Sequence, residues 1–293
     1  MLEPLPLVRI SMHLILISGL SGSGKSIALR ALEDAGYYCV DNLPTTLLPQ
    51  LVRQQRDEGC VKMAVAIDVR AGASIAALPQ VLRDLRTIDT EGTEPCFLFL
   101  EARDETLIAR FSETRRSHPL SNDDTTLAEA IVREREMLEN IAGLGNRIDT
   151  SSLHPNALRA WILDFAQLGV SQGLTLLFES FGFKHGIPLD ADLVFDVRCL
   201  PNPHYDPLLR PLTGRDAEVV RFLEGQEPVR KMAQDIRRFL ADWLPAYVRD
   251  NRSYLTVALG CTGGQHRSVY LAEWLAHEFR EQARVLVRHR AIT

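Results

Sequence analysis

Apolar residues in the first half of the chain follow two alternating patterns. Short, nearly continuous apolar runs predict buried strands at residues 13–18, 37–40, 61–67, 96–101 and 147–151. Between them, apolar positions recur every three or four residues and predict helices at 27–35, 46–57, 74–86, 104–114, 127–140 and 155–168. A polar loop is expected at 89–95. Strands that alternate with helices predict an α/β fold whose parallel sheet is covered on both faces.

The same alternation restarts in the second half, after residues 169–173, which we interpret as a linker. Further strands are predicted at 174–180, 193–198, 254–260 and 284–290, and helices at 217–224, 229–248 and 269–280. We therefore expect two α/β domains, at 12–170 and 171–293. Residues 1–11 contain Pro4 and Pro6 and precede the first strand, so we expect a poorly ordered N-terminal extension.

A phosphate-binding motif joins the first predicted strand to the first helix. It consists of Gly19, Leu20, Ser21, Gly22, Ser23, Gly24, Lys25 and Ser26 and matches G-x-x-x-x-G-K-[ST], the Walker A loop. Its glycines permit a positive φ and a close approach of the backbone, so that loop N–H groups and the helix N-terminus can bind phosphate oxygens. Lys25 is expected to reach the β- and γ-phosphates of ATP or GTP, and the Ser26 hydroxyl is expected to hold Mg²⁺.

Acidic residues follow the second and third predicted strands. Asp68 ends an apolar run in the manner of a Walker B strand, whose acid helps to hold Mg²⁺, and with Lys25 and Ser26 it completes the predicted catalytic set. Asp41 has two interpretations. It either contacts substrate or Mg²⁺ at the carboxyl edge of the sheet, or it forms a turn with Asn42 before Pro44.

Two groups of cationic side chains also have a functional and a structural interpretation. Arg110, Arg115 and Arg116 resemble the lid arginines of small P-loop kinases, which neutralise charge during phosphoryl transfer, but they also fit a solvated basic helix face. His204 lies with Asp206 in a rigid, proline-rich loop, where it can either bind a polar ligand or be buried and hydrogen-bonded.

A second strand–glycine loop–helix unit occurs at residues 254–280. His266 and Arg267 lie at the predicted helix N-terminus, a place that favours anions. The same loop spells C-x5-R-[ST] from Cys261 to Ser268, the spacing of cysteine-dependent phosphatases. The residue before the cysteine is Gly260 rather than the histidine usual in that family. We therefore favour binding of a phosphorylated ligand or an RNA phosphate there, with Cys261 as a small buried residue.

Composition narrows the class of protein. Hydrophobic residues at 46% and charged residues at 24% are typical of a soluble globular protein, and a net charge of −5 argues against a surface coated with basic residues. Five scattered cysteines without a C-x-x-C pair indicate neither a disulfide framework nor a zinc ribbon, so we expect a cytoplasmic protein. No apolar run is long enough to span a membrane.

Several stretches together resemble the RapZ family of bacterial nucleotide-binding proteins, and the resemblance covers nearly the whole chain from Met12. The stretches are residues 19–26, 38–44, 114–120, 178–188, 201–207 and 260–270. The resemblance implies an N-terminal P-loop kinase-like domain that binds and hydrolyses ATP and GTP. By that likeness residues 19–26 form the ATP site. The segment assigned to GTP is Asp68, Val69, Arg70 and Ala71.

In enterobacterial members of this family, the C-terminal domain binds small regulatory RNAs and senses an amino-sugar phosphate. The matching ligand positions here are His204, Thr262, Gly263, His266 and Arg267. The enterobacterial form also has a lysine-rich tail that contributes to RNA binding, whereas this chain has no lysine beyond Lys231. Fewer phosphate contacts predict a weaker affinity for RNA.

Three hypotheses follow. The first is a regulator with slow ATPase and GTPase activity, whose C-terminal domain binds a phosphorylated metabolite, a small RNA or both. The second is a P-loop kinase that phosphorylates a small molecule. The third is an RNA-binding adaptor that uses the nucleotide only as a sensor. Under all three we expect a homo-oligomer.

Overall fold

The computed structural model describes residues 12–88, 95–122, 124–167, 174–249 and 254–292. The expected N-terminal extension, the linker at 169–173 and residues 89–94 of the polar loop lie outside these ranges. The described residues form two compact units, one from residues up to Ser151 together with 158–167, the other from residues 174 onward together with 152–157. No helix among them is long and apolar enough to cross a membrane.

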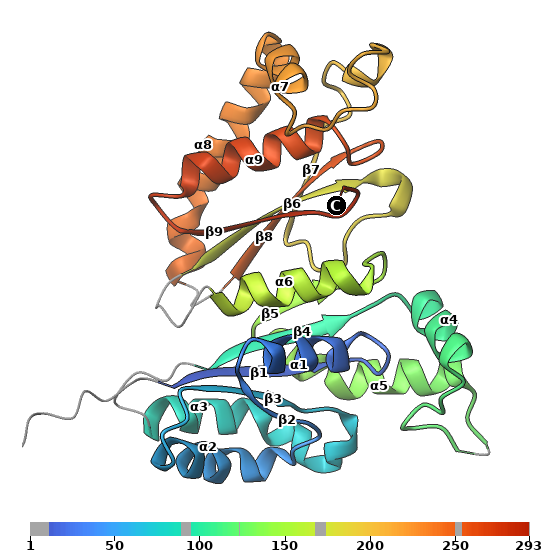
Figure 1. Ribbon diagram of the computed structural model, residues 1–293, viewed down its shortest axis with the longest axis vertical. Coiled ribbons are helices and arrows are strands. Elements are labelled where there is room, and N and C mark those ends of the chain that lie inside the picture. The colour runs from blue at the N-terminus through green and yellow to red at the C-terminus, as the bar shows by residue number, and fades with distance from the viewer. Residues whose placement is uncertain (1–11, 89–94, 123, 168–173, 250–253, 293) are drawn as a thin grey trace, which may run out of the picture. The chain divides into compact units, whose positions relative to one another are not determined.

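The first unit is built on a five-stranded sheet of order β2-β3-β1-β4-β5, in which all neighbours are parallel (Figure 1). Its strands are β1 (His13–Gly19), β2 (Tyr38–Val40), β3 (Lys62–Ala66), β4 (Cys96–Glu101) and β5 (Asn146–Asp149). Its helices are α1 (Lys25–Asp34), α2 (Leu48–Asp57), α3 (Leu78–Ile88), α4 (Asp104–Thr114), α5 (Leu127–Ala142) and α6 (Pro155–Gln167). Because all strands run the same way, the residues that follow β1, β2 and β3 meet at one edge.

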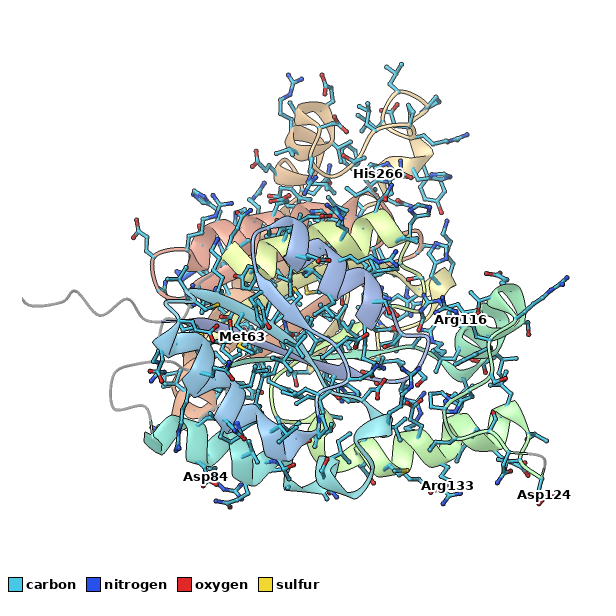
Figure 2. All side chains as sticks on the ribbon, turned by 60° about the horizontal axis from the view of Figure 1, so that its bottom comes forward. Met63, Asp84, Arg116, Asp124, Arg133 and His266 are labelled. Atoms are coloured by element: carbon cyan, nitrogen blue, oxygen red, sulfur yellow. The ribbon has the colours of Figure 1, made fainter. Side chains whose placement is uncertain are left out.

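Helices cover both faces of this sheet because its strands are apolar on both sides. Alternate residues of β1 and β3 pack with α2, α3 and α5 in one cluster, to which the buried Met63 belongs (Figure 2). The other face buries Ile15 and Ile17 together with apolar residues of α1 and α6. Trp161 of α6 exposes only 7% of its surface, so it is a core residue, as its helical spacing predicts.

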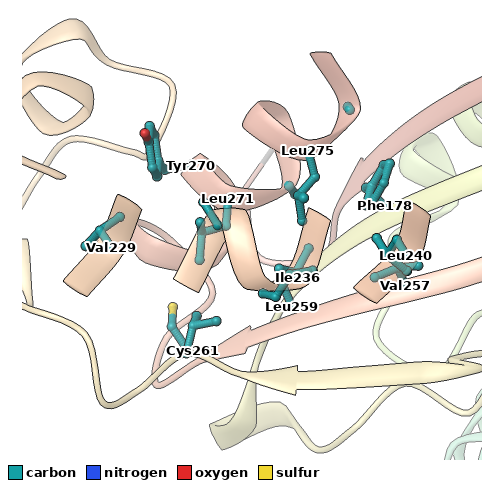
Figure 3. Close-up of a cluster of buried hydrophobic side chains, with 14 of the residues drawn as sticks. Phe178, Val229, Ile236, Leu240, Val257, Leu259, Cys261, Tyr270, Leu271 and Leu275 are labelled. Carbon is teal, nitrogen blue, oxygen red and sulfur yellow. The ribbon is translucent and has the colours of Figure 1, made fainter. Parts of the chain in front are cut away.

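The second unit has a four-stranded parallel sheet of order β7-β8-β6-β9. Its strands are β6 (Thr175–Gly182), β7 (Leu193–Asp196), β8 (Tyr254–Cys261) and β9 (Arg284–His289). One face carries α7 (Ala217–Glu224), α8 (Glu227–Arg249) and α9 (Arg267–Phe279). The side chains between this face and the helices form a continuous apolar core that includes Phe178, Val257, Ile236 and Leu275 (Figure 3).

The parallel α/β fold predicted from the hydrophobic pattern is confirmed, with element ends displaced by up to three residues in most cases. One prediction was wrong in part. The helix expected from residue 74 is preceded by a 3-10 segment, η2 (Val69–Ala77), and becomes α-helical only at Leu78. Gly72, with φ 61° and ψ −140°, breaks the helical backbone inside η2. Short 3-10 turns also occur at η1 (Thr45–Leu47), η3 (Phe183–His185) and η4 (Pro203–Tyr205).

Candidate functional site

The Walker A loop lies between β1 and α1, with its backbone pressed against the neighbouring strand. Gly19, Gly22 and Gly24 have φ values of 138°, 85° and 109°, which glycine adopts without strain. A Cβ on Gly19 would lie 2.0 Å from the Leu100 carbonyl oxygen, and the next residue, Leu20, donates its N–H to that same oxygen at 3.0 Å. Strand β4 therefore fixes where the loop begins.

Lys25 occupies the centre of a cluster of charged groups. Its Nζ donates to the carbonyl oxygens of Gly19 at 2.6 Å and Leu20 at 3.1 Å. Burial lowers the pKa of Lys25, the carboxylates of Glu134, Asp68 and Asp41 oppose this shift, and the Arg70 charge adds to it. The exposed Ser26 follows in the first turn of α1. The side chains of Leu20, Ser21 and Ser23 are buried. We therefore expect these residues to contact phosphate through their backbone N–H groups.

Asp68 is held in place at the carboxyl end of β3. It is 5% exposed, caps η2 and accepts the Arg70 N–H at 2.9 Å. Asn42 adopts a left-handed φ of 55°; with its side-chain amide oriented to suit its neighbours, its nitrogen donates to Asp68 at 2.9 and 3.2 Å. In the same orientation the Asn42 oxygen accepts from Arg70 Nη1 at 3.1 Å. Within the segment assigned to GTP, Val69 is buried and Arg70 is exposed.

Glu134 of α5 is the residue of this site that sequence reasoning missed. It is fully buried. Its Oε2 accepts the Ser21 N–H at 2.8 Å and lies 3.0 Å from His118 Nε2, and its Oε1 accepts the Ser21 hydroxyl at 2.7 Å. Burial favours the neutral acid, but the His118 hydrogen bond, the Lys25 charge and the Ser21 hydrogen bonds together lower the pKa of Glu134. A buried carboxylate thus braces the loop from beneath.

The sequence did contain a signal for this brace. Glu134 lies on the same face of α5 as the buried residues Ile131, Leu138 and Ile141. The helical spacing of these apolar residues therefore predicts that position 134 is buried in the core. A carboxylate in such a position needs polar partners.

Arg110 and Thr150 hold the loop from the side. Arg110 donates to the Gly22 carbonyl at 3.0 Å and to the Thr150 hydroxyl and carbonyl at 3.0 and 2.6 Å. The Thr150 hydroxyl in turn lies 2.9 Å from the Ser23 carbonyl. Arg110 therefore braces the loop in this structure, and its role as a lid arginine stays a prediction. Arg115 and Arg116 are exposed after α4 (Figure 2).

The second loop, residues 261–268, lies between β8 and α9. The buried Cys261 sulfur accepts the Gly264 N–H at 3.2 Å and lies 3.2 Å from the Ser268 hydroxyl. Burial raises the pKa of the Cys261 thiol, but these hydrogen bonds and the positive charge of Arg267 outweigh it, so that the pKa is lowered overall. The loop packs closely against the end of β6. A Cβ on Gly182 would lie 2.7 Å from the backbone of Gly263, so a glycine is needed at position 182.

A cavity of about 560 Å³ lies beside this loop. It is lined by Arg198, Cys199, Leu200, Pro201, Asn202, Tyr205, Pro228, Thr262 and Arg267. Arg267 is only 4% exposed, and its Nη1 donates to the carbonyl oxygens of Arg198 at 2.8 Å and Leu200 at 2.9 Å. Thr262 is exposed, so the cavity joins a buried cation to an accessible hydroxyl.

The two histidines predicted for this site differ in their surroundings. His266, labelled in Figure 2, is buried. Its Nε2 lies 3.2 Å from the Leu209 carbonyl oxygen, to which a protonated Nε2 donates. Burial lowers the pKa of His266 below its usual value. His204 is exposed, and its ring centroid lies 6.4 Å from that of His266. Thr262 and Arg267 line the cavity, whereas the backbone of Gly263 packs against Gly182.

The fold and the first loop define a class of protein, the α/β proteins with a Walker A loop between the first strand and the first helix. Comparison with known families is more specific. The profile of the RapZ-like N-terminal domain matches residues 12–167, and that of the RapZ C-terminal domain matches residues 174–293. The chain belongs to the RapZ family.

Close relatives share nearly the full length of the chain. A nucleotide-binding protein of Azoarcus sp. is 66% identical over 280 residues, 96% of this chain and 95% of the relative. One from Nitrosomonas europaea is 62% identical over 96% of each chain. A gluconokinase from Sinorhizobium meliloti resembles 55% of this chain and 94% of its own, with 18% identity and a TM-score of 0.35.

Proposed function

We propose that the chain binds ATP or GTP with Mg²⁺ in a single site of the first unit and hydrolyses either nucleotide slowly. The observation that carries this proposal is Lys25, whose ammonium lies within the Walker A loop and interacts electrostatically with both Asp68 and Arg70. These interactions support a single site that includes both the segment assigned to ATP and the segment assigned to GTP. The names of the relatives, nucleotide-binding proteins, support the binding of a nucleotide.

The oxygen donors of this site suit Mg²⁺. The ion prefers one or two protein oxygens together with phosphates, and the Ser26 hydroxyl and the Asp68 carboxylate are the groups that would hold it. Among the described residues no cluster of three or more His, Cys, Asp or Glu is arranged to hold a metal. We expect the ion to arrive with the nucleotide, because Mg²⁺ is usually held by one or two carboxylates together with substrate phosphates. When bound, it would neutralise charge on the phosphate oxygens.

Slow hydrolysis follows from how the nearby side chains are used. Lys25 supplies a positive charge to the phosphates. Of the three candidate lid arginines, Arg110 is occupied by Gly22 and Thr150, and Arg115 and Arg116 are exposed after α4. Fast P-loop enzymes add an arginine that stabilises the transition state, worth about 10³ to 10⁵ in rate. A slow enzyme of this kind fits a regulator, because the bound nucleotide persists long enough to be sensed.

Phosphate release from ATP and from GTP tests this proposal. We expect Lys25→Ala to abolish both activities, because the loop loses its contact with the β- and γ-phosphates. Lys62→Ala is the matched control, since Lys62 is an exposed lysine at the opposite end of β3 from Asp68. Full activity of Lys25→Ala would refute the assignment.

We also infer that the second unit senses a phosphorylated small molecule, with a small RNA as the alternative ligand. The cavity beside residues 261–268 supports this, because it combines the N-terminus of α9, the buried Arg267 and the exposed Thr262. Titration with a sugar phosphate tests it. We expect Thr262→Val to weaken binding about tenfold, the value of one lost hydrogen bond, and Arg221→Ala, an exposed arginine of α7, to bind normally. Binding of RNA alone would favour the alternative.

A further inference from the structure

Binding of a phosphate does not account for the sulfur in the second loop. Cys261 Sγ accepts the N–H of Gly264 at 3.2 Å. It also lies 3.2 Å from the hydroxyl of Ser268, a residue in the first turn of α9. Donors on both sides, together with the N-terminus of a helix, stabilise a thiolate over a thiol. The pKa of Cys261 is accordingly lowered, although burial works in the other direction. Cys261 is a buried member of the apolar core, as its sequence context predicts, yet its sulfur also has these polar partners (Figure 3).

Arg267 gives a second, independent indication of a ligand. It is 4% exposed, and its Nη1 is positioned by the carbonyl oxygens of Arg198 and Leu200. Its Nε, in contrast, has no hydrogen-bond partner within the described ranges. Arg267 and Thr262, the residue next to Cys261, both line the cavity. Arg267 interacts electrostatically with Asp196, and its Nε beside the cavity has a hydrogen bond left to donate to a ligand anion.

We propose that the loop at 261–268 is a phosphomonoesterase site in which the Cys261 sulfur is the nucleophile and Arg267 binds the phosphoryl oxygens. This rests on the proposed phosphate site of the second unit and deepens it. The C-x5-R-[ST] spacing places the sulfur and the arginine at opposite ends of one loop, whose N–H groups and helix N-terminus receive the phosphate between them.

The chemistry balances without an added oxidant or reductant. The thiolate of Cys261 attacks phosphorus, a sulfur–phosphorus bond forms, and the ester phosphorus–oxygen bond breaks. The leaving alcohol takes a proton from solvent. Water then attacks the thiophosphate and releases inorganic phosphate, the sulfur leaves as the thiolate, and one proton passes to solvent.

The experiment uses the full chain with para-nitrophenyl phosphate, a small aryl phosphomonoester. We expect release of nitrophenolate, and we expect mass spectrometry of the quenched mixture to find one phosphoryl group on the peptide that contains Cys261. Cys261→Ser should lower the rate by about a thousandfold or more, in the range that follows loss of a catalytic nucleophile. Cys60→Ser, which changes a partly exposed cysteine of the first unit, is the matched control and should leave the rate unchanged.

Binding of inorganic phosphate to the same preparations separates the two claims. If phosphate binds but no phosphocysteine forms and no ester is cleaved, the phosphatase proposal is wrong and the binding site stands. If phosphate does not bind at all, both are wrong. Trapping of the phosphoryl group on a residue other than Cys261 would also overturn the proposal. The trapped peptide comes from the unaltered chain, so this result does not depend on how well Cys261→Ser folds.

Discussion

Removal of the Glu134 carboxylate should destabilise the first unit more than most single changes. Glu134→Ala leaves three donors without their acceptor, namely the Ser21 N–H, the Ser21 hydroxyl and His118 Nε2, all at buried positions. A buried unsatisfied group costs about 1–3 kcal/mol, and breaking a buried charged pair costs about 3–5 kcal/mol. The hydroxyl and the imidazole can partly reorient, so we expect a loss of about 3–5 kcal/mol in unfolding free energy.

Glu134→Gln is the matched variant. Its amide oxygen can accept from the Ser21 N–H and from His118, while its nitrogen can donate to the Ser21 hydroxyl. The shape and the contacts are kept and only the charge is lost. Charge-assisted hydrogen bonds are about twice as strong as neutral ones, so we expect a smaller loss of about 1–2 kcal/mol.

The assay is urea unfolding followed by the fluorescence of Trp161, which reports the first unit. Trp243 and Trp274, in the second unit, are replaced by phenylalanine in every variant. Because the pKa of Glu134 is lowered in the fold, its charge stabilises the protein above the ordinary glutamate value of 4.5. The advantage over Glu134→Gln should therefore shrink as the pH falls below about 4.5. Unfolding of Glu134→Ala within about 0.5 kcal/mol of the unaltered chain would refute the bracing role.

Two further changes test other parts of the account. Gly19→Ala places a methyl group 2.0 Å from the Leu100 carbonyl oxygen, on a backbone with a φ of 138°. We expect urea unfolding to show a loss of about 3 kcal/mol or more in unfolding free energy. A loss below about 1 kcal/mol would contradict the close approach of β4. The His289 and Arg215 hydrogen bonds lower the pKa of Glu273 to about 2, so the charged side chain stabilises the fold. Glu273→Gln should therefore unfold at a lower urea concentration than the unaltered chain at pH 7. This difference in midpoint should disappear as the pH falls from 4.5 to 2. A difference that does not change with pH would contradict this.

The fold was largely predictable because its periodicity is strong and local. Apolar runs ending in glycine or aspartate gave the strands, and the Walker A spacing gave the position of the first loop to the residue. The start of α3 carried a signal that apolar spacing does not show. Pro79 has no N–H to donate to the Ile75 carbonyl, so an α-helix cannot run unbroken from residue 74, and α3 begins one residue before this proline.

The candidate sites were predictable only where a motif is contiguous. Residues 19–26 and 261–268 were found in this way. Glu134 lies 113 residues from Ser21, and the partner of Arg110 is a backbone carbonyl, so neither contact leaves a local pattern. Glu101 shows the converse. It ends β4 in the manner of a site residue, yet its carboxylate is buried against Arg147 at 2.6 Å and forms part of the structure.

The central claim is that one site of the first unit takes either ATP or GTP. Equilibrium titration with ATP and Mg²⁺, followed by displacement with GTP, tests it most directly. The account predicts one ATP per chain, full displacement by GTP, and at least a hundredfold weaker binding by Lys25→Ala, which corresponds to about 2.7 kcal/mol. Simultaneous binding of both nucleotides, or unchanged affinity in Lys25→Ala, would contradict it.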